Sequence, residues 1–185
     1  AEHGQAAAST LASVSDLFEA ADYFGRVSVE VQNQHAPALA QQGISAQATL
    51  ILGGQIAGQP PAMYLIYPQG NYFSASPETP YLQIGENKYG KPVLDRLART
   101  DMSLEDAARL CLVSLDATAR SNVTVGPPFE LALYPRDALA LSHRLKLAPE
   151  APLLAATSQT WQRGMTRAFA GLPRFDWEGG DATLV

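Results

Sequence analysis

Residues 81–97, YLQIGENKYGKPVLDRL, decide the fold class, because they read as a strand that passes through a short polar turn into a helix. The first four residues favour an extended strand. Gly85 and Gly90 bound the turn, and Pro92 suits the first turn of a helix, where no N–H is needed. This elbow is expected either simply to turn a corner or to point backbone N–H groups at a ligand.

Three β-rich runs precede the elbow, and clusters of Gly and Pro separate them. Such punctuation predicts antiparallel hairpins. An amphipathic helix comes before the strands. Asp16 caps it, apolar residues recur at helical spacing to about Gln34, and Pro37 and Gly43 predict its end. The strands are expected at residues 47–52, 62–67 and 71–76.

A second helix is expected after the elbow, from Ser103 to about Arg120, because Ser103 followed by Asp106 is a capping signature. Its centre, residues 110–115, is apolar nearly all the way round. A helix of this kind is buried on more than one side, so we expect it to pack on the sheet of residues 46–76 and on a further partner.

The C-terminal third is less regular. It contains a strand over residues 129–134 and a last helix, marked by large apolar residues at every fourth position over 161–169 and stopped by Gly171. Residues 178–185 read as a flexible tail, which leaves 1–177 as a single domain. Because strands are grouped between helices and do not alternate with them, the fold class is α+β, with antiparallel sheets layered against helices.

The composition of the 185 residues, 46% hydrophobic and 17% charged, is that of a globular domain. A net charge of −5 with no basic cluster excludes a nucleic-acid footprint, so no nucleic-acid partner is expected. The apolar runs are too short to cross a bilayer, which predicts no membrane partner. The lone Cys111 suits a reducing cytoplasm. The opening residues show no signal-peptide pattern and have linker composition.

Motifs for common chemistries are absent. His3, His35 and His143 lie far apart without ligand spacing, so neither a metal nor a cofactor is expected. The chain lacks a GxSxG elbow, a GxGxxG turn and a phosphate-binding loop. The residues alone therefore indicate an α+β domain without a defined activity.

Three blocks carry a resemblance to a known family. They are the elbow itself, ATLILGGQIAGQPPAMYLIYPQGNYFSASPETP before it, and SLEDAARLCLVSLDATARSNVTVGPPFELALY after it. They resemble the Anbu family, bacterial proteasome-type proteins predicted to be threonine peptidases. The resemblance runs from about Asp16 to Tyr134 and loosely on to Trp177. It implies a four-layer αββα sandwich of the N-terminal nucleophile hydrolase type, a ring-like or open helical homo-oligomer, and a peptide or unfolded protein as substrate.

The resemblance also implies that two loops border the catalytic site. At the elbow, Ile84-Gly85-Glu86 stands where related subunits have Ser-Gly-Ser, so both hydroxyls are replaced. After the second helix, Ser121 stands where they have Asp, and Thr124 where they have Ser. The plainer alternative is that Ser121 and Asn122 only cap the end of a helix. The implied site-bordering residues are Gly85, Glu86, Lys88, Ser121, Asn122 and Thr124.

The nucleophile itself has no counterpart in the chain. Peptidases of this type use the hydroxyl of their first residue and its free α-amine as base, whereas this sequence begins with Ala1. No residue of the chain is therefore expected to be catalytic, and the nucleophilic Thr, its acidic partner and its Lys are expected upstream. The 185 residues alone are expected to be inactive. Two alternatives stay open, a non-catalytic assembly subunit and an unrelated α+β ligand-binding domain.

Overall fold

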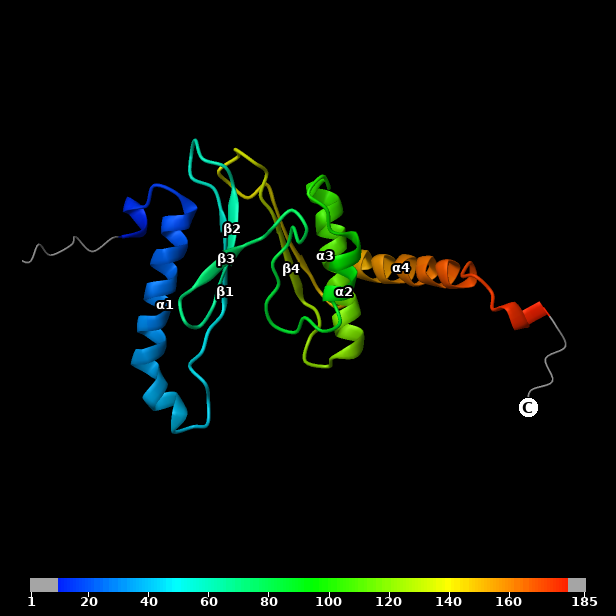
Figure 1. Cartoon of the computed structure of the whole chain (residues 1–185), viewed down its shortest axis with the longest axis horizontal. Helices are drawn as coiled ribbons and strands as arrows, with labels where there is room; N and C mark the ends of the chain where they lie inside the picture. The colour runs from blue at the N-terminus through cyan, green and yellow to red at the C-terminus, as the bar shows by residue number, and fades with distance from the viewer. Residues whose placement is uncertain (1–9, 180–185) are drawn as a thin grey trace, which may run out of the picture.

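A computed structural model describes residues 10–179, with the elements spread along one long axis. Helix α1, a three-stranded sheet, a β-hairpin and the pair α2 and α3 follow one another along this axis, and α4 points away from them (Figure 1). The expected tail lies outside the described residues from Gly180 onward. The helices are α1 (Leu17–Ala40), α2 (Lys91–Leu97), α3 (Leu104–Ser121) and α4 (Pro152–Ala170), and the strands are β1 (Leu50–Gly54), β2 (Ala62–Ile66), β3 (Tyr72–Ser74), β4 (Phe129–Leu133) and β5 (His143–Leu147).

Helix α1 begins as predicted and ends later than predicted. The Asp16 carboxylate accepts a hydrogen bond from the Glu19 N–H at 2.8 Å, which caps the helix. The expected break at Pro37 is wrong, because the helix continues to Ala40. Proline lacks the N–H that would bond four residues back and its ring crowds that carbonyl, but its fixed φ is compatible with a helix and only three residues of α1 follow it, so it is tolerated here. The helix ends at Ala40, and the chain turns away from it at Gly43, whose φ of 69° only glycine adopts easily.

The first sheet has the order β1-β2-β3 and is antiparallel throughout, as the hairpins predicted. Strand β1 starts at Leu50, three residues later than expected. Its partner explains this, because Leu50 pairs with Ile66, the last residue of β2, and earlier residues have no strand to pair with. Helix α1 packs on this sheet, mainly on β2, and the contact buries Ala20 and Ala21 of α1 and Ile66 of β2.

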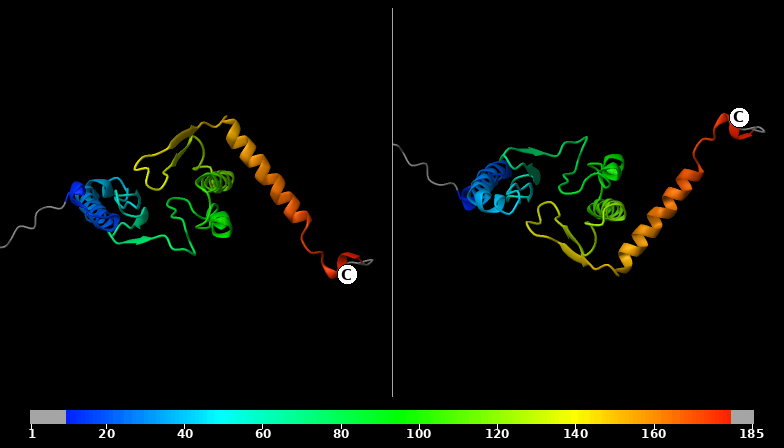
Figure 2. Two further views of the ribbon diagram at one scale, coloured as in Figure 1. Left: turned by 90° about the horizontal axis from the view of Figure 1, so that it is seen from above. Right: turned by 90° about the horizontal axis from the view of Figure 1, so that it is seen from below.

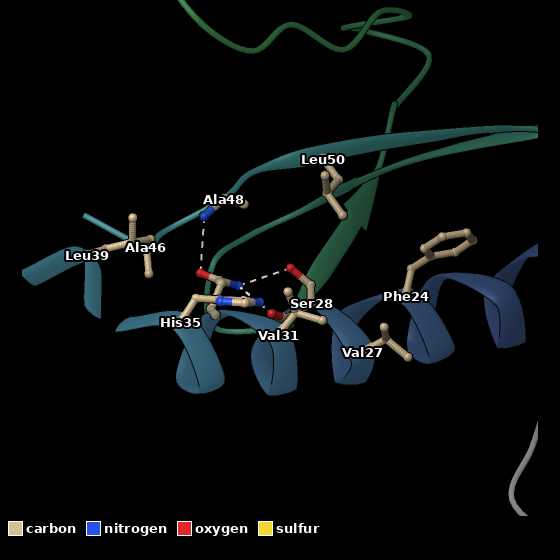
Figure 3. Close-up of a pocket in the computed structure, with 10 residues that line it drawn as sticks. Phe24, Val27, Ser28, Val31, His35, Leu39, Ala46, Ala48 and Leu50 are labelled. Atoms are coloured by element: carbon tan, nitrogen blue, oxygen red, sulfur yellow. Dashed lines mark hydrogen bonds between the residues drawn. The ribbon is translucent and has the colours of Figure 1, made fainter. Parts of the chain in front are cut away.

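Gln32 ties α1 to the sheet with hydrogen bonds in two directions. Its side-chain amide donates to the Pro68 carbonyl at 3.1 Å, and its side-chain oxygen accepts from the Ala48 N–H at 3.1 Å. An apolar groove of about 390 Å³ runs beside this bridge, between α1 and the chain leading into β1 (Figure 3). Helix α1, which forms one wall of this groove, lies at the opposite side of the first sheet from α2 (Figure 1).

The second sheet is the hairpin β4-β5, of which β5 was not predicted. Its core is formed by Leu112 of α3 packed against Phe129 and Leu147 from the two strands. Helix α3 contacts α2, α4 and β4. The expectation that it packs on the sheet of residues 46–76 is therefore wrong, although the burial of several of its sides is confirmed. Helix α3 packs on the β4-β5 hairpin and not on the first sheet. The hairpin is the nearer partner in the chain, because β4 begins at Phe129, shortly after α3 ends.

The expected strand at residues 81–84 is also wrong. This stretch is irregular and pairs with no strand among residues 10–179. It leaves β3 and runs across to α2 (Figure 1). Within the same described range, no helix has the length and apolar content that crossing a bilayer requires.

Candidate functional site

The elbow forms a tight loop around the side chain of Glu86. Gly85 has a φ of 81°, a conformation that glycine adopts without steric cost, and it reverses the chain after residue 84. One carboxylate oxygen of Glu86, Oε1, then accepts the backbone N–H of Lys88 at 2.9 Å. The carboxylate is thereby held by its own loop, and its second oxygen is free for another donor.

A second loop begins where α3 ends at Ser121. The side-chain oxygen of Asn122 accepts the backbone N–H of Thr124 at 2.9 Å and its hydroxyl at 2.7 Å. This is the local turn that Asn commonly forms after a helix. The backbone N–H of Asn122 closes the helix by donating to the Thr118 carbonyl at 2.8 Å. Asn122 thus caps the C-terminal end of α3, as the plainer of the two sequence interpretations expected.

The two loops are joined by one hydrogen bond between side chains. The Asn122 amide nitrogen donates to Oε2 of Glu86 at 3.0 Å, across 36 positions of sequence. The structure therefore brings Glu86, Lys88, Asn122 and Thr124 into one network, with Gly85 as its turn. Ser121 lies beside this network as an exposed residue at the last position of α3.

Close packing of α2 against α3 holds the loops at this distance. The buried Gly90, which ends the elbow, lies on α3 at Ser114 and Thr118. A Cβ on Gly90 would lie 2.4 Å from Ser114 Oγ and 2.8 Å from Thr118 Oγ1. Both polar side chains are buried, and the Thr118 hydroxyl donates to the Ser114 carbonyl at 2.9 Å. Only glycine permits this approach.

A cluster of three polar side chains closes the outer side of the elbow. Lys91 Nζ donates to Asp95 Oδ1 at 2.6 Å and to the Tyr81 hydroxyl at 3.1 Å, and the same hydroxyl donates to Asp95. The Lys91 partner lowers the pKa of Asp95, and the Asp95 carboxylate in turn raises the pKa of Lys91. Burial, and then the neighbouring Asp95, raise the pKa of Tyr81. The cluster links the chain before the elbow to the helix after it.

Sequence reasoning missed this cluster and one further residue. Lys91 and Asp95 are four residues apart on a helix, a spacing at which side chains meet, and that signal was available. Val123 had no such signal. It stands between Asn122 and Thr124 at the rim of the site, and its side chain is fully exposed.

The chemistry available to this site is that of a fixed carboxylate. Ionised Glu86 is an acceptor only, and after two hydrogen bonds it still has lone pairs for a cationic donor such as an ammonium group. No group of three or more His, Cys, Asp or Glu side chains able to hold a metal ion occurs in residues 10–179.

The chain was compared with protein families, with curated proteins and with solved structures. No protein-family model and no curated protein matches its sequence. Several solved structures match. Anbu from Pseudomonas aeruginosa, described as a helical assembly, is 40% identical with a TM-score of 0.80, over 88% of this chain and 67% of the other. Anbu from Yersinia bercovieri, described as an ancestral β-subunit, is 36% identical with a TM-score of 0.81, over 91% and 69%. Anbu from Hyphomicrobium sp. strain MC1 is 35% identical with a TM-score of 0.81, over 95% and 71%.

These matches cover 88–95% of the chain. They define the chain as a proteasome-like subunit with an α+β fold. The chain belongs to the Anbu family. The resemblance that the elbow and its flanking blocks indicated is confirmed.

Proposed function

We propose that this chain supplies the later part of a subunit in a self-assembling, proteasome-type threonine peptidase that hydrolyses peptides or unfolded proteins. The nucleophile in this proposal is a Thr upstream of Ala1, with its acidic partner and its Lys. The chain covers only 67–71% of the lengths of its relatives, which leaves room for such a segment. The peptidase would work in the cytoplasm, in keeping with a single Cys111 and no disulfide framework.

The observation that carries the proposal is the hydrogen bond between Asn122 and Glu86. The family resemblance assigns the elbow and the end of α3 to the border of one site, and this bond holds the two together. A half-buried hydrogen bond between two side chains 36 positions apart is not required for a simple change of chain direction. It fits a role in setting the geometry of a site.

The role proposed for these residues is to position the reacting N-terminus. A hydroxyl nucleophile of this kind is activated by its own α-amine, which must be uncharged to accept the proton. A carboxylate near that amine sets its pKa and its orientation. Glu86 is the acidic group of the network, and Asn122 and the Lys88 N–H fix where its oxygens point.

The order of elements supports a four-layer αββα arrangement in the complete subunit. Helix α1 and the first sheet lie on one side, and the hairpin with α2 and α3 on the other (Figure 1). Between the sheets lies a space lined by Gly53, Met63, Pro80 and Tyr134, among others. The upstream segment is proposed to fill it and to complete both sheets.

The test is peptide hydrolysis by the full natural protein and its variants. Asn122→Ala should lower kcat severalfold without abolishing assembly, since it frees Glu86 from the helix end. Glu105→Gln, an exposed acid at the start of α3, serves as the control and should leave turnover unchanged. Turnover that Asn122→Ala leaves untouched, or that resists an inhibitor of N-terminal threonines, contradicts the proposed site. Assembly without any turnover in the natural protein would favour the alternative of a non-catalytic assembly subunit.

A further inference from the structure

The side chain of Val123 is more exposed than that of any other large apolar residue in residues 10–179. Its relative exposure is 101%, and the next value, 77%, belongs to Phe169. Turns after a helix usually carry Gly, Asn, Asp or Ser, so the turn itself does not require a branched apolar residue here. A single exposed apolar residue is ordinary on a protein surface, so its surroundings decide whether it has a role.

The turn that carries Val123 is fixed by its neighbour Asn122, which forms hydrogen bonds in three directions. The Asn122 carbonyl accepts the Val125 N–H at 3.1 Å. Its side-chain oxygen accepts the N–H and the hydroxyl of Thr124, and its side-chain nitrogen donates to Glu86. A contact made by Val123 therefore orders little additional backbone, and preorganisation of this kind lowers the entropic cost of binding.

Val123 lies beside the group that the proposed site uses to position the reacting N-terminus. That group is the Glu86 carboxylate, and its side-chain partner Asn122 directly precedes Val123 in the chain. Consecutive Cα atoms are about 3.8 Å apart. We therefore expect a peptide whose scissile bond reaches the N-terminus near Glu86 to pass within reach of the Val123 side chain.

The neighbouring elements leave this rim of the site open. Helix α4 contacts α3 where Arg120 donates to the Ser158 hydroxyl, and it then runs away from α2 and α3 (Figure 2). The cation of the elbow, Lys88 Nζ, lies 5.6 Å from the centroid of the Tyr89 ring, a distance that fits a cation–π contact. Among residues 10–179, none covers Val123.

We propose that Val123 contacts the substrate and gives the peptidase a preference for an aliphatic side chain next to the scissile bond. This inference rests on the function proposed above and adds a specificity-determining residue to the same site. A β-branched side chain has few rotamers to lose when it is contacted, and the removal of apolar surface from water on both partners is favourable. A charged substrate side chain would lose hydration against Val123 and gain no partner from it.

The experiment profiles cleavage of an internally quenched peptide library by the full natural protein, with each residue around the scissile bond varied in turn. The natural protein should favour Val, Ile or Leu at one position. Val123→Asp should lower kcat/KM for those peptides about tenfold, the scale of one lost apolar contact. At the same position, Val123→Asp should raise the relative preference for Lys or Arg, and Val123→Lys that for Asp or Glu, each about two- to fivefold, as expected for exposed ion pairs.

Two controls separate a substrate contact from a structural role. Val123→Ile keeps a branched apolar side chain and should keep the preference. Leu104→Asp places the same charge on an exposed apolar residue at the other end of α3, about 25 Å along the helix, and should leave the profile unchanged. Because the Val123 side chain is fully exposed, both of its charged variants should unfold at the denaturant midpoint of the natural protein.

The outcomes distinguish this contact from the proposed function. A profile that neither charged variant shifts, or a uniform fall in turnover with no change in preference, overturns the contact and leaves peptide hydrolysis standing. A lower unfolding midpoint or a loss of assembly, with the preference unchanged, also overturns it, because the upstream segment or a second copy would then cover Val123. A natural protein that hydrolyses no peptide of the library overturns the proposed function, and the substrate contact with it.

Discussion

Gly25 of α1 and Gly70 of the turn between β2 and β3 meet backbone against backbone. A Cβ on Gly25 would lie 2.2 Å from the Gly70 carbonyl oxygen, and one on Gly70 would lie 3.0 Å from that of Gly25. Helix α1 therefore rests on the sheet at a distance that side chains would prevent. The buried Ala20 and Ala21, one turn earlier, belong to the same close approach.

Replacing Gly25 with Ala should destabilise the protein although alanine is the better helix former. The helix gains about 1 kcal/mol from propensity, but the added methyl must push α1 off the turn, and overpacking of this kind costs about 1–3 kcal/mol. The control is Gly164→Ala in α4, where a Cβ meets nothing within 4 Å. Chemical unfolding should show a lower midpoint for Gly25→Ala and an unchanged or higher one for Gly164→Ala. Equal midpoints would contradict the contact.

Gly90→Ala should destabilise the elbow for a similar reason, and a second substitution should relieve part of the loss. The methyl would overlap Ser114 Oγ, so Ser114→Ala removes the nearest atom. The Ser114 carbonyl, 2.9 Å from that Cβ, stays in place, so the rescue is partial. In a double-mutant cycle we expect a coupling of about 0.5–3 kcal/mol. Additive effects of the two substitutions would mean that they do not touch.

Much of this fold followed from sequence patterns, and the misses have physical causes. Turn residues and caps are local signals, so the hairpin of β1 and β2 and the start of α3 were predictable. Tyr81 and its neighbours have strand propensity, but propensity does not supply a partner strand, and no strand within residues 10–179 pairs with them. In β5, Leu145 and Leu147 do alternate with polar residues. Only Leu147 is buried, because Leu145 is nearly half exposed, so the alternation is too short to predict a strand.

The candidate site was predictable only as two separate loops. The family resemblance singled out Glu86 and Asn122, but not the bond between them. That bond depends on how closely α2 approaches α3, which Gly90 sets through tertiary contacts that no spacing in the sequence reveals. The family resemblance also indicated Ser121, but Ser121 is not part of the hydrogen-bond network that joins the two loops.

Glu86→Gln should move the acid limb of the pH–rate profile for peptide hydrolysis to lower pH. Under the proposed function, the carboxylate favours the protonated α-amine and raises its pKa, whereas only the free amine acts as base. Removing the charge lowers that pKa, by up to about one unit for groups separated by several ångströms. The profile of kcat/KM for the full natural protein measures it. A limb that stays in place or moves to higher pH would count against Glu86 at the site.

The Tyr81–Lys91–Asp95 cluster should make the stability of the elbow depend on pH. Asp95 has a depressed pKa, so its contribution is present above the ordinary carboxyl range near pH 4 and is lost as pH falls through the lowered value. Lys91 has a raised pKa, so its contribution persists at neutral pH and is lost only at strongly basic pH. The difference in unfolding free energy between the protein and Asp95→Asn should therefore vanish in strong acid. A difference that persists there would exclude the ionised pair as its source.

The contact between Gly90 and α3 also affects how the site can fail. Glycine has no side chain and the Thr118 hydroxyl is held on the Ser114 carbonyl, so of the side chains at this contact only that of Ser114 could adjust by a change of rotamer. We therefore expect α2 to be either packed on α3 or separated from it, with few intermediate positions. Separation of α2 from α3 would move the elbow, and Glu86 with it, away from Asn122. We therefore expect the hydrogen bond between Glu86 and Asn122 to be either intact or fully broken in any one molecule.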